Sequence, residues 1–338
     1  AQYLKDFGDL SSKGEFEFDA AINGQLSDKE FPRIDVNIAL KDGKISSPRL
    51  SHPLKDVSFS ANFTNGKSRN NTSSVFEIPN LKGYFNRELI EVSLKVKNLD
   101  DPRIDFNSDG VIPLASIYKM FNSSVVTDGR GEIEFKNLSL NGRYKDMLTT
   151  SRVSRVSLGG EIEFDDAGLE VNDEEILIDR GNLVFKNNVL AVSDFKIDGV
   201  GSEVNLEGTF YNLLPVLFAD EKNSKNAELR FQANLNSPKM DLARIVKLTG
   251  SGVEEGEVKR VVYDSLREAN TQKRSQVVDL LKGTFEATVE NFTYDKIEGQ
   301  DFKGKLEFKN SQMSNEGSAK GMDGSFDLDG TAYLQNQP

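Results

Sequence analysis

Short runs in which apolar and polar residues alternate follow one another along most of this chain. One run covers Phe16 to Ile22, a second covers Ile34 to Leu40, and a third covers Val57 to Phe63. Successive side chains on a β-strand point to opposite faces, so each run gives one apolar face and one polar face. Gly, Asn, Asp or Pro residues close nearly all of the runs, as turns require. The pattern predicts a long β-sheet with one apolar side.

The number of runs also sets the architecture. About 15–18 strands spaced ~4.8 Å apart would form a sheet ~70–85 Å long. Open sheets of that size curl or split. We therefore expect a mainly β fold, an elongated and curled antiparallel β-sheet groove that is continuous over residues 1–338. Within it we expect β modules over 1–250, a helical insertion over 251–283 and a C-terminal β module over 284–338.

A few segments change from the strand period to a helical one. Apolar residues recur at three and four positions in 113–121, which predicts a short amphipathic helix. Residues 213–218 predict a buried turn or a single helical turn. Residues 241–248 predict a short helix with Asp241 as its N-cap.

One segment has the length of a long helix. Residues 254–282 carry apolar side chains at helical spacing, with acidic residues at the start and Gly283 after the end. Residues 270–276 are polar on the apolar face as well, so either one helix or two helices fit this segment.

Composition excludes several classes of function. The net charge is −12, and we find no basic stripe along the sequence, which argues against nucleic acid and against docking on anionic lipid through a polybasic patch. The chain has no Cys, so it forms neither disulfides nor Cys-based zinc sites. It has no run of 18 apolar residues, and it begins at Ala1 rather than Met, so we read it as a portion of a longer protein.

No group of residues predicts catalysis. The single histidine, His52, precedes Pro53 in a turn, and acid–base chemistry needs partner groups. Carboxylates such as Asp165 and Asp166 fit turns and solvated strand faces better than a glycosidase pair. The segment 323–330 lacks the ligand spacing of a calcium loop. We expect a protein that is not an enzyme, with no catalytic residues, no metal and no cofactor.

Two stretches resemble the AsmA family of bacterial envelope proteins. In Ile38 to Phe63, IALKDGKISSPRLSHPLKDVSFSANF, a strand, a DGK-I turn and a Pro-Leu segment precede a strand that begins at a D-V pair. In Leu94 to Ile117, LKVKNLDDPRIDFNSDGVIPLASI, a strand leads through a Pro and an Ile-Asp-Phe segment into a short helix. Weaker similarities occur at 231–245, 129–140 and 285–334, and the Asn- and Lys-rich style is similar to the Bacteroidetes members.

This resemblance implies a place in the cell and a role. It implies a periplasmic protein of Gram-negative bacteria that is tethered to the inner membrane by an N-terminal helix absent from this sequence. It implies a repeating β-groove of the chorein-like type that supports outer-membrane biogenesis by carrying phospholipid between the membranes. It transfers no individual site residues, because the family has a groove rather than a site.

Alternation alone selects the residues that we expect to line such a groove. A trough too wide for its side chains to meet leaves apolar area for acyl chains to cover, at ~0.8 kcal/mol per buried CH₂. The expected lining residues are Ile34, Val36, Ile38, Val57, Phe59, Ala61, Val92, Leu94, Ile104, Phe106, Ile133, Phe135, Phe231 and Ala233.

Two other classes of function stay open at this point. In the first, the same sheet has a filled core and acts as a structural envelope protein through protein partners. In the second, the chain is a carbohydrate-binding or adhesive β-helix or sandwich, which would need facing carboxylates or an aromatic platform. The absence of Trp argues against such a platform.

Overall fold

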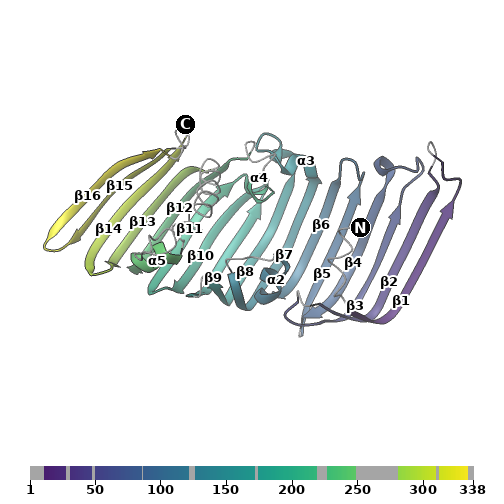
Figure 1. Ribbon diagram of the computed structural model, residues 1–338, viewed down its shortest axis with the longest axis horizontal. Helices are drawn as coiled ribbons and strands as arrows, with labels where there is room; N and C mark the ends of the chain where they lie inside the picture. The colour runs from purple at the N-terminus through teal and green to yellow at the C-terminus, as the bar shows by residue number, and fades with distance from the viewer. Residues whose placement is uncertain are drawn as a thin grey trace, which may run out of the picture. The chain divides into compact units, whose positions relative to one another are not determined.

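The computed structural model describes residues 11–27, 31–47, 50–85, 87–121, 126–171, 174–218, 227–248, 281–309 and 312–333. These residues form a mainly β structure with a few short helices (Figure 1). The chain divides into two compact units. The first consists of residues 1–147, 152–169 and 184–188, and the second of residues 148–151, 170–183 and 189–338.

The first unit contains the N-terminal strands. They are β1 (Ser11–Asn23), β2 (Arg33–Ser46), β3 (Leu54–Thr64), β4 (Val75–Phe85), β5 (Glu88–Lys97), β6 (Arg103–Pro113), β7 (Val126–Arg143) and most of β8 (Ser157–Val171). From β1 to β7 each strand pairs antiparallel with the next one in sequence. Short connections allow this meander, because antiparallel neighbours need only a hairpin between them.

The second unit contains the C-terminal strands. They are most of β9 (Glu174–Lys186), then β10 (Val189–Gly199), β11 (Ser202–Tyr211), β12 (Leu229–Asp241), β13 (Leu281–Tyr294), β14 (Ile297–Lys309), β15 (Gln312–Gly321) and β16 (Gly324–Tyr333). Antiparallel pairing joins β10 to β12 and β13 to β16. The pair β12–β13 is parallel, which the antiparallel expectation did not include. Parallel neighbours need a crossover connection, and residues 242–280 connect these two strands.

Hydrogen-bonded pairing follows the order of the strands in the sequence, from β1 to β16. The fold class expected from alternation is therefore confirmed. Some strands run longer than the sequence pattern indicated because they contain a residue with positive φ where a turn was expected. Asp42 (φ 50°) lies inside β2 and Asp166 (φ 50°) inside β8, and Asn137 (φ 50°) lies likewise inside β7. Such bulges bend a strand without ending it.

The short helices lie between strands. They are α2 (Leu114–Phe121), α3 (Tyr144–Met147), α4 (Leu213–Leu217) and α5 (Leu242–Leu248), with the 3-10 turns η1 (Asn71–Ser73) and η2 (Val153–Arg155). Helices α2, α4 and α5 confirm the changes of period, whereas α3 was not expected. The Oδ1 atom of Asp241 accepts the Arg244 N–H at 3.0 Å, as the predicted N-cap requires.

The long helix expected over 254–282 lies mostly outside the described residues. Its C-terminal end was placed wrongly, because Leu281 and Lys282 begin strand β13. Gly283 lies in this strand rather than after a helix, and its backbone passes close to Phe231. A Cβ atom at Gly283 would lie 2.0 Å from the Phe231 carbonyl oxygen, so no other residue fits there.

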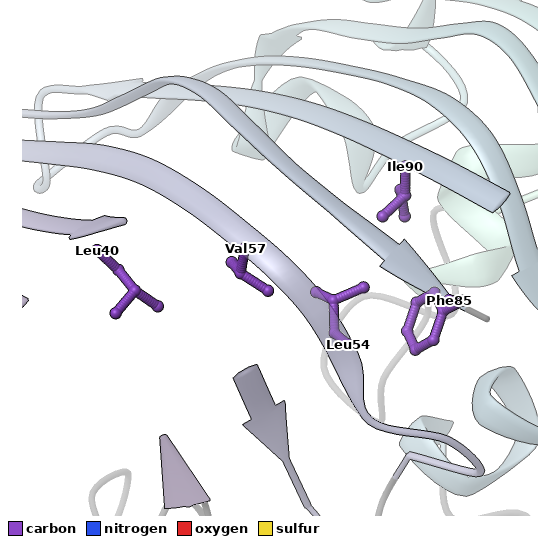
Figure 2. Packing of buried hydrophobic residues seen from close by; sticks show 5 residues of the cluster. All are labelled: Leu40, Leu54, Val57, Phe85 and Ile90. Atoms are coloured by element: carbon purple, nitrogen blue, oxygen red, sulfur yellow. The ribbon is translucent and has the colours of Figure 1, made fainter. Parts of the chain in front are cut away.

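One packed cluster forms on the apolar face of the first unit. Leu40, Leu54, Val57, Phe85 and Ile90 are all buried there, and Figure 2 shows them on one side of strands that bend across the view. Ile45, Leu50, Phe59, Val92 and Ile112 pack around this cluster. Part of the apolar face is therefore filled by the protein's own side chains.

Candidate functional site: the apolar face of the sheet

Strand register places the expected lining residues of the first unit on one face. Residues directly opposite in an antiparallel pair project to the same side. Ile38 on β2 lies opposite Ala61 on β3, and Leu94 on β5 lies opposite Phe106 on β6. Further partnerships on this side include Ile22 with Ile34, Ala20 with Val36, Leu40 with Phe59, Gly43 with Val57, Leu81 with Val92, Val96 with Ile104, Ile112 with Ile133 and Gly110 with Phe135.

The second unit repeats this arrangement around Phe231 and Ala233. Phe231 on β12 lies opposite Phe210 on β11, and their rings stack with centroids 6.0 Å apart. The Phe308 ring on β14 reaches Phe231 at a centroid distance of 5.8 Å. The register thus groups the expected residues of each unit with other apolar side chains across neighbouring strands, and their role as a lining stays a prediction.

The expected residues fall into two groups by burial. Val57, Ala61, Ile133, Phe231 and Ala233 are buried. The others, Ile34, Val36, Ile38, Phe59, Val92, Leu94, Ile104, Phe106 and Phe135, are half-buried. A half-buried apolar side chain in the middle of a strand keeps surface that another apolar group can cover. The face is thus filled near the cluster of Figure 2 and around the other buried residues, and it is less covered at the half-buried positions.

Each unit also exposes apolar side chains on this face at its edge strand. In β1, Phe16, Phe18 and Ile22 expose 62%, 61% and 67% of their surface, although they lie opposite Leu40, Ile38 and Ile34. In β16, Phe326 and Leu328 expose 47% and 54%. Large apolar groups gathered on one exposed surface are typical of a binding surface.

The opposite face of the first unit carries charged pairs. Lys82 and Glu91 lie directly opposite on β4 and β5 with 2.5 Å between Nζ and Oε1, and Lys95 and Glu77 form the next pair at 2.8 Å. Such pairs favour contact with water on this side and fix the register of the strands.

A further ion pair joins β7 to β8. The Lys136 ammonium donates a hydrogen bond to Glu163, and this bond is the main reason why the pKa of that carboxyl lies below its usual value. The same bond raises the pKa of Lys136.

The other residues examined in the sequence fall in turns and strands. His52 lies in a bend beside Ser51, whose Oγ is 3.1 Å from its Nδ1, and Ser51 also meets Ser116 of α2. Asp165 and Asp166 lie within β8, and most of 323–330 lies in β16. In the part of the chain that the structure describes, no three His, Asp or Glu side chains gather as a metal site requires. Among the helices of the described ranges, none is long and apolar enough to cross a membrane.

Sequence reasoning missed one feature of the first unit. We found no basic stripe along the sequence, but the register aligns Lys97, Arg103 and Arg143 in one row across β5, β6 and β7. All three are exposed. They are far apart in the sequence, so only the strand pairing reveals the row.

Comparisons with known proteins do not assign this chain to a family. No family model, no curated protein and no solved structure matches this chain.

Proposed function

We propose that this chain is a non-enzymatic segment that carries or shields phospholipid acyl chains on its apolar face. The observation that carries the proposal is the register of the strands. It lines up apolar side chains from β1 to β7, and again from β10 to β16, and leaves many of them half-buried. A surface of this kind offers apolar contact without a discrete site.

The energetics favour a mobile apolar ligand. Covering apolar surface contributes roughly 25 cal/mol per Å², or ~0.8 kcal/mol for each buried CH₂ of a fatty chain. Leu94 and Phe106 provide such surface in the middle of their strands, and equivalent rows continue on both sides. Because each contact is small and non-directional, an acyl chain gains affinity from many rows and can slide between them.

The resemblance to the AsmA family supports the cellular setting of this proposal. Under it, the chain lies in the periplasm, is tethered to the inner membrane, and supports outer-membrane biogenesis by moving phospholipid between the two membranes. The stretches that carry the resemblance, Ile38 to Phe63 and Leu94 to Ile117, contribute to the apolar rows of the first unit.

Mass spectrometry of lipid extracted from the purified protein tests the proposal. We expect phospholipid to co-purify in the wild type and to decrease when Phe106 is changed to Glu. Asn107→Glu is the matched control, because Asn107 is the next residue of β6 and faces the opposite side, where it donates to Ser93. A wild-type protein free of lipid, in a host that makes phospholipid, would overturn the proposal.

A second candidate function is a structural envelope protein that acts through protein partners. The packed cluster of Leu40, Leu54, Val57, Phe85 and Ile90 favours it locally, because side chains of the protein fill the face there. Phe59 packs against this cluster, so a charge at Phe59 would unfold the region under either function. Phe106 lies outside the cluster and separates the two: unfolding of Phe106→Glu supports the structural function, and a folded protein without lipid supports lipid carriage.

A further inference from the structure

Three cationic side chains form a row where three strands of the first unit end. Lys97 is the last residue of β5, Arg103 the first of β6 and Arg143 the last of β7. Lys97 lies directly opposite Arg103, which lies directly opposite Arg143. Opposite residues in an antiparallel pair have Cβ atoms about 4.5–5.5 Å apart. The row therefore concentrates positive charge at the edge of the polar face, where these three strands end.

Three further cations lie next to this row. Lys145 belongs to α3, which follows β7 directly, and Arg152 and Arg155 belong to the turn around η2. Val156 packs on Gly142, which places η2 beside the end of β7. We call this group of side chains the cationic rim; its members are Lys97, Arg103, Arg143, Lys145, Arg152 and Arg155.

Two partly buried carboxylates contact four of the cations in the rim. Asp101 lies 3.6 Å from both Arg143 and Lys145, and Asp146 lies 3.8 Å from Arg152 and 4.0 Å from Arg155. The Asp101 and Asp146 side chains are only 28% and 11% exposed, whereas these four cations are 42–69% exposed. The carboxylates thus lie inward and the cations face water.

The local charge is positive in a chain whose net charge is −12. The nearby carboxylates are Asp101, Asp146, Asp105 two residues after Arg103, and Asp100, which accepts hydrogen bonds from Asn71 and Thr72. Six cations against these four carboxylates leave a charge of +2.

This geometry fits an anion with several oxygen atoms. Like charges directly opposite each other destabilise a sheet, and a bound anion removes that cost. At 3.6 Å the contacts of Asp101 with Arg143 and Lys145 exceed hydrogen-bond length, so they orient the cations without occupying their donors. A guanidinium binds phosphate oxygens in a bidentate fashion, and an ammonium binds them as a point charge.

We propose that the cationic rim binds the phosphate groups of anionic lipid headgroups at a membrane surface. This inference extends the proposed function, and it rests on that function because it assumes that lipid tails lie on the apolar face. Strand ends are where that face meets water, so a lipid that enters or leaves it presents its headgroup there. The rim would then hold the membrane beside the place where tails reach the sheet.

Flotation with vesicles tests the proposal on the full chain. We expect the wild type to bind vesicles of phosphatidylglycerol and phosphatidylcholine at low salt, and to bind phosphatidylcholine alone far more weakly. The variant Lys97→Gln/Arg103→Gln/Arg143→Gln should lose about a hundredfold in partitioning, as expected for three basic side chains near an anionic surface. Its thermal midpoint should stay close to that of the wild type, because the removal of like charges offsets the loss of the Arg143 contact with Asp101 and of the Arg103 hydrogen bond to Asn141.

The matched control removes the same number of positive charges elsewhere in the first unit. Lys41→Gln/Lys55→Gln/Lys67→Gln alters three exposed lysines outside the rim and should bind within about threefold of the wild type. Equal losses in both variants would show a general charge effect and overturn the proposal. If the rim variant does not fold, Lys97→Gln/Lys145→Gln should still lose about tenfold or more, and unchanged binding by it would overturn the proposal.

Two additional measurements separate the sources of phosphate and the two proposals. Inorganic phosphate at the same phosphate concentration should not displace the protein from vesicles; displacement would assign the rim to free phosphate and overturn the membrane assignment. Lipid extracted from the same proteins reports on the apolar face alone. Co-purified lipid without vesicle binding contradicts only the rim, and vesicle binding without co-purified lipid contradicts only the carriage of acyl chains.

Discussion

Leu94 on β5 and Phe106 on β6 lie directly opposite each other, so their side chains share the apolar face of the first unit. Both are half-buried, and neither belongs to the packed cluster around Val57. This pair represents the part of the face that can accept a ligand without displacing the protein's own core.

The first prediction concerns a charge placed on this pair. Phe106→Glu should lower the transfer of fluorescent phospholipid between vesicles by at least about tenfold, because an acyl chain on the face would leave the carboxylate without water or a partner. The thermal midpoint should change little, because water can solvate the introduced carboxylate when no lipid covers the face. Asn107→Glu, on the other face of the same strand, should transfer lipid at the wild-type rate, and equal loss in both variants would contradict the assignment of faces.

The second prediction distinguishes the filled part of the face from its edge. Leu40 is 4% exposed and lies in the packed cluster, so Leu40→Ala should lower the free energy of unfolding by about 2–5 kcal/mol. Phe18 lies on the same face of β1 but is 61% exposed, and Phe18→Ala should change stability by roughly 0.5 kcal/mol or less. Urea unfolding followed by circular dichroism measures both, and equal losses would mean that another part of the protein covers the edge.

The third prediction follows from the lowered pKa of Glu163. A carboxyl whose pKa is lower in the folded state stabilises the protein above its unfolded pKa, and this stability is lost as the pH falls through the folded value. Thermal midpoints of the wild type and of Glu163→Gln should therefore differ at neutral pH and converge below the usual pKa of Glu, about 4.3. A constant difference down to that acidic range would show that the charge of Glu163 is not its cause.

The fourth prediction concerns the start of α5. Asp241→Ala removes the acceptor of the Arg244 N–H and should cost about 0.5–2 kcal/mol of stability, which thermal or urea unfolding measures. Asp241→Asn keeps an oxygen acceptor and should retain most of that stability. If both substitutions behave alike, the cap contributes nothing and the loss comes from the charge of Asp241.

Much of the fold follows from the sequence because alternation is a local property. The apolar side of each strand depends only on neighbours two residues apart, which is why Ile38, Phe106 and Phe231 were assigned to the apolar face. The period change and Asp241 were sufficient to place α5. These features need no knowledge of what packs against them.

Other features depend on partners that alternation does not identify. Asp42 and Asp166 are residues of a type that favours turns. Each instead forms a bulge within a strand that stays paired with its neighbour, so the expected strands were too short. The parallel pairing of β12 with β13 depends on a connection through 242–280. The row of Lys97, Arg103 and Arg143 joins residues 46 positions apart through strand register alone.

Photo-crosslinking tests the central claim most directly. A benzophenone amino acid at Phe106 should form crosslinks to phospholipid when the protein is expressed in a Gram-negative host, and the same group at Asn107 should form few. Lipid adducts at Phe106 and not at Asn107 would match a face that carries acyl chains. Crosslinks at Phe106 only to the protein's own residues would contradict the account.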